Sequence, residues 1–263
     1  MTAVVSKQMH IDAHDVEQQF RSVFAKAGTV DFRNLVQSLP ISANLDPDIR
    51  LRLVTHVRRA YDLSKKKQLR SYDNMIRTLQ AVEAAGVAVI VVTNAPIYHA
   101  FTRVRDVGAL PYLYGLVAWS DPEEIYEGDA IDEHIALTRR NILRLARRNL
   151  NFVSTFSKAD SKPSSHPFEL IIERFGKALY YSLGDSLSKD LLPAAQVGMR
   201  TIWARYGTHV QDERDLSTLL TMTPWTAEEI SYHLEQAFSP DYIIDDPSEL
   251  LSILPHYDQL DLF

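Results

Sequence analysis

The pattern of hydrophobic and polar positions changes character near residue 86. Between residues 8 and 80, apolar residues recur at three- and four-residue steps, as they do on one face of a helix. The spacing predicts helices over 16–24, after Asp46, and over 72–85. Asp15 stands before the first of these runs as a candidate N-cap, and Gly86 follows the third as a helix stop. This part of the chain is therefore predicted to be helical, with little strand.

After Gly86 the pattern consists of short apolar blocks separated by helical patterns. The block 87–92 is β-branched and apolar on both faces, which is typical of a strand buried in a parallel sheet. Further strands are predicted at 115–119, 178–183, 201–204 and 242–244. Helices are predicted at 97–107, 133–149, 167–176 and 227–237. The alternation predicts an α/β fold whose parallel sheet carries helices on both faces and binds ligands at the carboxyl ends of its strands.

Two parts are thus expected, a helical region over 8–80 and an α/β core over 81–263. Two stretches look like insertions into that core. The first, 120–160, is acidic and then helical; the second, 206–226, is polar and contains Pro224. Either is interpreted as a lid or as an inert surface excursion.

Composition narrows the function classes. The chain has 263 residues, of which 46% are hydrophobic and 24% charged, so it is expected to be globular. A net charge of −6 disfavours a nucleic-acid binder that relies on overall charge. There is no cysteine, which excludes disulfide scaffolds and thiolate chemistry. No apolar run has the length of a signal peptide core or a membrane span, so a cytoplasmic location is expected.

Basic residues gather in two clusters, at 50–70 and at 139–148. Such runs are most often solvated helix faces; the alternative is a surface that attracts an anionic substrate or partner. The histidines form no HxxxH or HExxH arrangement, and GxGxxG, Walker and GxSxG motifs are absent. Zinc hydrolases, dinucleotide and P-loop enzymes and serine esterases are therefore disfavoured. The sequence carries no signal of oligomeric state.

Three short segments follow predicted strands and carry candidate chemistry. In the first, the Thr93 hydroxyl and Asn94 precede backbone amides that enter a helix, an arrangement that can bind an anionic oxygen group, although a plain helix cap is the alternative. In the second, Lys162 stands in a loop restricted by Pro163 and can neutralise phosphate or carboxylate charge. A solvated lysine in a turn is the alternative there.

The third segment, Gly184 to Asp190, is the most specific. Asp185 and Asp190 are five positions apart across a predicted strand-to-helix turn. Mg²⁺ prefers carboxylate oxygens and keeps several waters, so one or two such acids suit a magnesium site next to a phosphate. Asp190 could ligate the ion or hold Lys189 or Lys162 in place. A helix cap plus a surface acid is the structural alternative.

In this order, the three segments resemble the haloacid dehalogenase-like (HAD) hydrolase superfamily. Thr93 matches its second motif, Lys162 with Pro163 its third, and the sequence GDSLSKD at 184–190 its fourth. The resemblance continues through 194–207 and 242–254, and the helical region 8–80 resembles the cap that many members insert after the first motif. It therefore covers most of the chain.

The resemblance implies a Rossmann-like sheet and Mg²⁺-dependent phosphoryl transfer to an aspartate nucleophile. Thr93 would bind the transferred phosphoryl group, and Lys162 would steady its charge and the nucleophile. Asp185 would ligate Mg²⁺, and Asp190 would ligate it indirectly or orient Lys162. The expected substrate is a small phosphorylated metabolite, as for a nucleotidase or a phosphoglycolate phosphatase.

The first motif of that superfamily, an apolar strand ending in Asp-x-Asp, is not visible before residue 87. Asp12 lies in the nearest candidate segment, but its apolar run is short, so helix capping explains this acid better. The residues 2–5 are strand-like and could fill the place of the first strand. In the superfamily that strand lies centrally, and without it the two neighbouring strands would expose unpaired backbone groups.

Three interpretations of the gap remain. The nucleophile strand lies upstream of Met1, or it has been lost, or another polypeptide supplies it. The first is preferred because Thr93, Lys162, Asp185 and Asp190 are all present. The functional alternative to a phosphatase is a catalytically silent scaffold that binds a phosphorylated ligand or a protein partner.

Overall fold

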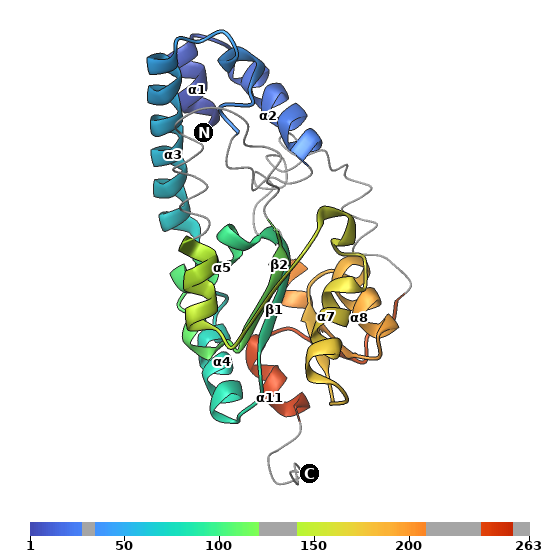
Figure 1. Ribbon diagram of the computed structural model, residues 1–263. Helices are drawn as coiled ribbons and strands as arrows, with labels where there is room; N and C mark the ends of the chain where they lie inside the picture. The colour runs from blue at the N-terminus through green and yellow to red at the C-terminus, as the bar shows by residue number, and fades with distance from the viewer. Residues whose placement is uncertain (28–34, 121–140, 209–237, 255–263) are drawn as a thin grey trace. The chain divides into compact units, whose positions relative to one another are not determined.

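The computed structural model describes residues 1–27, 35–120, 141–208 and 238–254 (Figure 1). The described residues fall into two compact units, Met1–Leu69 and a second unit that begins at Arg70. Each unit has its own hydrophobic core. We describe the two separately as the helical unit and the sheet unit.

Helices α1, α2 and α3 form the helical unit, with the short 3₁₀ helix η1. Their bounds are α1 Thr2–Met9, α2 Ala13–Ala27, η1 Pro40–Ser42 and α3 Pro47–Gln68. The Asp46 carboxylate accepts from the amide of Asp48 at 2.9 Å and caps α3. At the start of α2 the cap is Asp12, which accepts from the His14 amide at 2.8 Å. The prediction of Asp15 as the cap is therefore wrong, because Asp15 lies in the first turn.

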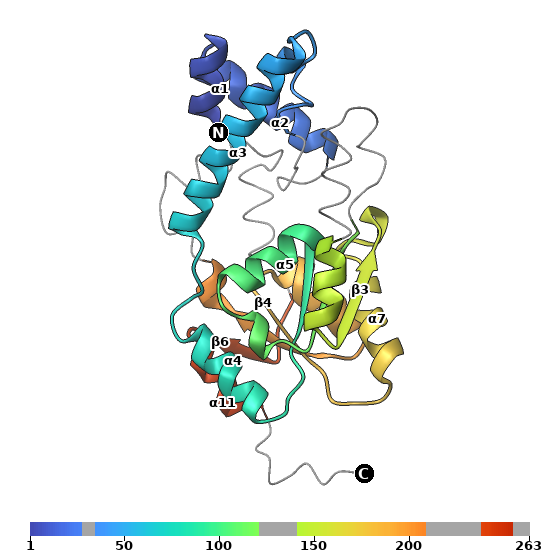
Figure 2. The same ribbon diagram turned by 60° about the vertical axis from the view of Figure 1, so that its left-hand side comes forward.

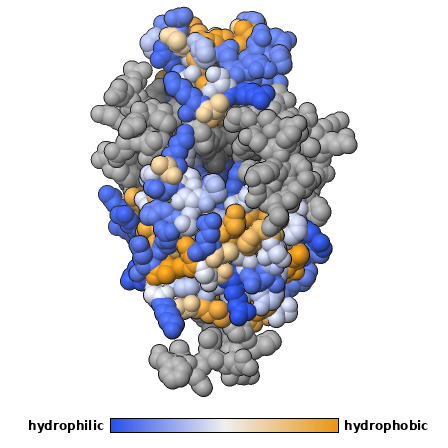
Figure 3. All heavy atoms as spheres, turned by 90° about the vertical axis from the view of Figure 1, so that its right-hand side faces the viewer, coloured by the Kyte–Doolittle hydropathy of each residue, from blue (hydrophilic) through white to orange (hydrophobic). Residues whose placement is uncertain are grey.

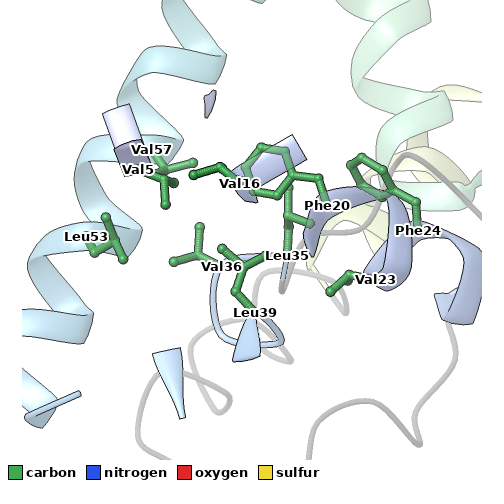
Figure 4. Packing of buried hydrophobic residues seen from close by; sticks show 10 residues of the cluster. All are labelled: Val5, Val16, Phe20, Val23, Phe24, Leu35, Val36, Leu39, Leu53 and Val57. Atoms are coloured by element: carbon green, nitrogen blue, oxygen red, sulfur yellow. The ribbon is translucent and has the colours of Figure 1, made fainter. Parts of the chain in front are cut away.

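The core of the helical unit is formed by apolar side chains from all three helices (Figure 4). Phe20 and Val5 are completely buried there, and Leu53 of α3 is 1% exposed. This packing corrects the expectation that residues 2–5 form a strand. They lie in α1, because Val5 buries its side chain against the neighbouring helices as one face of an amphipathic helix.

The sheet unit alternates strands and helices. Its strands are β1 Ile90–Pro96, β2 Gly115–Trp119, β3 Phe152–Phe156, β4 Tyr181–Gly184, β5 Arg200–Ala204 and β6 Tyr242–Ile244. Its α-helices are α4 Met75–Ala84, α5 Ile97–Asp106, a helix over 141–149, α7 His166–Phe175, α8 Leu192–Gln196 and α11 Leu250–Ile253. Short turns η2 Leu110–Tyr112, η4 Lys158–Asp160, η5 Leu187–Leu191, η6 Arg205–Thr208 and η7 Pro247–Glu249 connect them.

All described strand pairs are parallel, and they form two three-stranded sheets. One sheet has the order β1-β2-β3 and the other the order β4-β5-β6. Helices α4 and α5 lie on one side of β1 and β2, and α7 and α8 on the other (Figures 1 and 2). The predicted α/β class with helices on both faces is confirmed.

The strand β3 was not predicted, and its discovery corrects the interpretation of 120–160 as an insertion. Within that stretch, residues 152–156 pair with β2, and the helix over 141–149 buries Ala146 completely in the core beside α5. Serine and threonine interrupt the apolar pattern of this strand, which hid it from the hydrophobic pattern. Residues 121–140 and 209–237, which hold about half of the first predicted insertion, most of the second and the predicted helix 227–237, lie outside the described residues.

None of the helices in the described ranges combines the length and the low polarity that crossing a bilayer requires. Apolar residues do reach the surface of the sheet unit, as the orange areas on one face in Figure 3 show. Leu179, Leu183 and Ile243 are among its exposed large aliphatic side chains, between 37% and 57%. Leu179 precedes β4 and Leu183 belongs to it, and β4 is the end strand of its sheet among the described strands.

Candidate active site

The predicted site residues come from three connections that follow strands β1, β3 and β4. Thr93 and Asn94 belong to the last residues of β1, and Lys162 lies in the connection between β3 and α7. Asp185 follows the last residue of β4, and Asp190 lies in the π-helix η5. All five therefore belong to the carboxyl-terminal ends of strands in the sheet unit, as predicted for ligand sites of parallel sheets.

Lys162 is fixed at both its backbone and its side chain. The Asn94 amide nitrogen donates to the Lys162 carbonyl oxygen at 2.9 Å, and the Lys162 backbone amide donates to Asn94 Oδ1 at 2.9 Å. The Lys162 ammonium donates to the carbonyl oxygen of Val92 at 3.2 Å and pairs with Asp190. Both polar atoms of the Asn94 side chain thus bind Lys162, which makes positioning of the lysine the role that the geometry gives to Asn94.

Thr93 lies next to Val92, the residue whose carbonyl oxygen receives the Lys162 ammonium. Its hydroxyl oxygen accepts from the Ala95 amide at 3.1 Å, in a local turn where β1 ends and α5 begins. Because the hydroxyl accepts in this contact, its hydrogen is available for donation to an anionic oxygen. Lys162 and Thr93 therefore lie in the same part of the site.

Asp190 forms the second half of an ion pair that is mostly buried. The side chains of Lys162 and Asp190 are only 11% and 14% exposed. The other carboxylate oxygen of Asp190 accepts from the Ser186 amide at 3.2 Å. Of the two lysines considered as partners of Asp190 from the sequence, the structure therefore places Lys162 at its carboxylate.

Two glycines allow the acids to approach the backbone closely. A side chain at Gly184 would collide with the Asp190 side chain, whose Cγ would lie 2.9 Å from the added Cβ. A Cβ at Gly207 would lie 2.7 Å from the Cβ of Asp185. Distances below 3.0 Å require the neighbouring atoms to move. Any side chain at Gly184 or Gly207 would therefore displace the carboxylate beside it.

Burial raises the pKa of Asp185 above its ordinary value, and the charge of the neighbouring Asp190 raises it further. The positive charge of Lys162 acts in the opposite direction. Two carboxylates and one ammonium leave a net negative charge in a partly buried place, which favours binding of a cation. The donor set fits Mg²⁺, which needs only one or two carboxylates and retains water. Within the described ranges, no group of three or more His, Asp or Glu side chains could hold a metal ion.

Two tyrosines beside Asp185 were not recognised from the sequence. The rings of Tyr72 and Tyr206 pack edge to face with their centroids 5.1 Å apart. Burial, followed by the proximity of Tyr72 and Asp185, raises the pKa of Tyr206 to about 12. Burial and then Asp185 also raise the pKa of Tyr72. Both phenols are therefore neutral at physiological pH and can donate hydrogen bonds next to the acids.

Comparison with known proteins adds a structural likeness. No protein-family model matches this sequence, and no curated protein matches it. The fold is similar to that of a HAD phosphatase from Thermococcus onnurineus, with 18% sequence identity, a TM-score of 0.52, and coverage of 97% of this chain and 86% of that chain. It is also similar to a 2-haloacid dehalogenase from Pseudomonas syringae pv. Tomato DC3000, with 16% identity, a TM-score of 0.51, and coverage of 91% and 79%.

These matches extend over nearly the full chain, so the chain has the fold of the HAD-like phosphatases and dehalogenases. The resemblance noted from the three motifs is confirmed at the level of the fold. At such low identity the likeness does not carry activity or substrate from one protein to another.

Proposed function

We propose that the chain is a Mg²⁺-dependent phosphoric monoester hydrolase of the HAD type that acts on a small phosphorylated metabolite. The observation that carries the proposal is the buried Lys162–Asp190 pair with Asp185 beside it, in the connections that follow β3 and β4. An ammonium group and a threonine hydroxyl suit the charged oxygens of a phosphoryl group, and two acids suit the metal ion that phosphoryl transfer uses.

Each residue has a distinct task in this proposal. Asp185 and Asp190 hold Mg²⁺, which when bound neutralises phosphate charge. Lys162 supplies a fixed positive charge to the phosphoryl oxygens, and Asn94 keeps its backbone in place. Thr93 donates its hydroxyl hydrogen to one of those oxygens. The neutral phenols of Tyr72 and Tyr206 line the side of Asp185 and contribute to the choice of substrate.

The attacking carboxylate is the part that the described residues do not supply. Asp12, the candidate from the sequence, caps α2 through the His14 amide and belongs to the helical unit. This observation favours a second candidate function, a silent scaffold that binds Mg²⁺ and a phosphorylated ligand without hydrolysing it. The two functions share the site and differ only in turnover.

Turnover of p-nitrophenyl phosphate with and without Mg²⁺ separates the two functions. The hydrolase predicts Mg²⁺-dependent release of p-nitrophenol that is lost in Lys162→Ala, because the fixed ammonium is removed. Stabilisation by Mg²⁺ and inorganic phosphate without any turnover supports the scaffold. If neither turnover nor stabilisation occurs in protein whose circular dichroism indicates a folded state, both functions are wrong.

Replacing Asp185 by asparagine is expected to abolish stabilisation by Mg²⁺. In the unmodified protein, Mg²⁺ at a hundred times its Kd should raise the free energy of unfolding by about 2.7 kcal/mol. An amide in place of the carboxylate removes one charged ligand, so the rise should nearly vanish, as measured by thermal unfolding across a Mg²⁺ titration. Asp62→Asn, at an exposed acid of α3, serves as the control and should retain the full response. A full response in Asp185→Asn would remove this residue from the metal site.

A further inference from the structure

Asp185 lies one residue beyond the ladder that joins β4 to β5. The last pair of that ladder is Gly184 and Trp203. The Asp185 carbonyl oxygen is nevertheless tied to β5, because the indole Nε1–H of Trp203 donates to it at 3.0 Å. A side-chain donor thus continues the hydrogen bonding between the two strands by one residue. The backbone of this acid is therefore held from β5 after β4 itself has ended.

The connection after β5 holds Asp185 from a second direction. Gly207 lies so close to it that a Cβ added to this glycine would be 2.7 Å from the Asp185 Cβ. Burial, the nearby Tyr72 and then the charge of Asp185 raise the pKa of Tyr206, which places this phenol beside the same acid. Trp203, Tyr206 and Gly207 thus all lie next to Asp185, and we call these three residues the collar.

The segment that carries the collar is itself fixed within the sheet unit. Arg205 of this segment pairs with Asp245, directly after β6; its Nε donates to Asp245 Oδ1 at 2.6 Å, and its Nη2 donates to the other carboxylate oxygen. Such a two-point pair fixes orientation as well as distance. Thr208 Oγ1 donates to the Arg205 carbonyl oxygen at 2.7 Å, and the ring of Tyr206 packs against that of Tyr72. The indole that holds Asp185 therefore belongs to a braced segment.

A fixed carboxylate ligand favours Mg²⁺ over Ca²⁺. Mg²⁺ requires near-octahedral geometry with oxygen ligands at about 2.0–2.1 Å, whereas Ca²⁺ accepts oxygens at about 2.3–2.6 Å in flexible arrangements. A ligand that shifts by a few tenths of an ångström therefore loses more affinity for Mg²⁺ than for Ca²⁺. Hydrogen bonds to the residue that carries the ligand set its orientation.

We propose that Trp203 is a positioning residue that gives the candidate metal site its preference for Mg²⁺ over Ca²⁺. Its indole fixes the carbonyl of Asp185 and, through the adjoining backbone, the direction of the Asp185 carboxylate. An indole N–H is a donor only and cannot ligate a cation, so Trp203 acts through Asp185. Because Asp185 is a ligand only within the proposed function, the role of Trp203 rests on that function and adds the choice of metal to it.

The two tryptophans of the described residues have different surroundings. Trp119 is 4% exposed and belongs to the buried cluster that includes Val117 and Phe156. Trp203 is only half-buried, and its N–H donates to the backbone of a candidate ligand. Replacement of Trp119 therefore measures the loss of an indole from the core, and replacement of Trp203 measures the loss of the hydrogen bond to Asp185.

Trp203→Phe removes the N–H donor and keeps an aromatic ring. Thermal unfolding across titrations of Mg²⁺ and of Ca²⁺, at constant ionic strength, gives the two dissociation constants. The Kd of Mg²⁺ should rise about fivefold, which is the effect of one hydrogen bond. The Kd of Ca²⁺ should change by less than about twofold, because Ca²⁺ tolerates a displaced ligand. Trp119→Phe is the matched control; it should lower the Tm and leave the ratio of the two constants unchanged.

A second variant separates the hydrogen bond from packing. Benzothienylalanine at position 203 keeps the shape of the indole and has sulfur in place of the N–H. It should change the ratio of the two dissociation constants as Trp203→Phe does, with the Tm of the metal-free protein nearly unchanged. Should Trp203→Phe fail to fold, the variant with benzothienylalanine decides alone.

Three outcomes overturn the role of Trp203. They are equal weakening of both ions, which indicates a general structural role, an unchanged Kd of Mg²⁺ in the variant with benzothienylalanine, and an unmodified protein that binds Ca²⁺ at least as tightly as Mg²⁺. In each of these cases the unmodified protein still responds to Mg²⁺, so the proposed function stands. If the unmodified protein shows no stabilisation by Mg²⁺, the metal site of the proposed function is wrong, and the role of Trp203 is wrong with it.

Discussion

Replacing Lys162 by methionine is expected to lower the free energy of unfolding of the metal-free protein by about 3–5 kcal/mol at pH 7. Lys162 and Asp190 form an ion pair whose side chains are 11% and 14% exposed. Removal of the ammonium leaves the Asp190 carboxylate without its counter-charge, next to a second acid, Asp185. Methionine keeps the length of the side chain, so the loss reports on charge and not on packing. Chemical denaturation followed by circular dichroism measures it.

The loss should depend on pH in a defined direction. The pKa of Asp185 is raised in the folded state, by burial and by Asp190, so the folded state binds protons more readily than the unfolded one. Stability from this group is complete below the ordinary aspartate pKa and is lost as pH rises through the raised value. Lys162 lowers the pKa of Asp185, so removing Lys162 lets Asp185 stay protonated up to a higher pH. The loss of unfolding free energy in Lys162→Met should therefore be smaller at pH 5 than at pH 7.

Lys177→Met is the matched control, because Lys177 is an exposed lysine between α7 and β4. Its free energy of unfolding should change by less than about 0.5 kcal/mol. A deficit in Lys162→Met that is below about 1 kcal/mol, or equal at both pH values, would mean that the ammonium does not compensate the two acids. The charge balance on which the proposed Mg²⁺ site depends would then be wrong.

The strand positions were predictable where apolar blocks end abruptly. Strands β2 and β6 have the predicted bounds, 115–119 and 242–244. Strand β1 begins at Ile90 and not at residue 87, because the chain still leaves α4 there, with the Val87 amide bonded to the Val82 carbonyl. Strand β3 was missed because its polar residues in mid-strand break the run that the pattern requires.

Short apolar runs do not distinguish a strand from a buried helix. Residues 2–5 illustrate this, since their sequence suits a strand and their packing against the helical core makes them helix. Whether residues 2–5 form a strand or a helix depends on packing partners that are distant in the sequence, such as Leu53 in α3. Local pattern alone holds no information about them.

At the candidate site, the types of the residues and their order along the chain could be used for prediction, whereas the contacts between them could not be predicted from the sequence. The acids and the lysine were singled out because their chemistry suits phosphate and Mg²⁺, and their placement near one another follows from the parallel sheet. The role of Asn94 in holding Lys162 and the presence of Tyr72 beside Asp185 depend on contacts between separate segments. The boundary between helical and α/β regions and the roles of the site residues stay predictions.

Replacing Phe20 by alanine is expected to destabilise the helical unit by about 3–5 kcal/mol and to leave the candidate site intact. Phe20 is completely buried in a core formed by α1, α2 and α3, and its ring lies 6.2 Å from that of Phe24. Alanine leaves a cavity there that the surrounding helices fill only in part. Hydrogen exchange read by mass spectrometry should show loss of protection in peptides from the three helices.

Peptides from β2 and β5 should keep their protection in Phe20→Ala, and stabilisation by Mg²⁺ should persist, because all five site residues belong to the sheet unit. Phe20→Leu is the matched control, and it should cost about 1.5 kcal/mol or less since it retains most of the buried volume. Equal loss of protection in the strands and in the helices would show that the two units unfold as one. The helical core would then be a part of the same cooperative structure as the sheets, and the predicted separation of a helical region from the α/β core would be wrong.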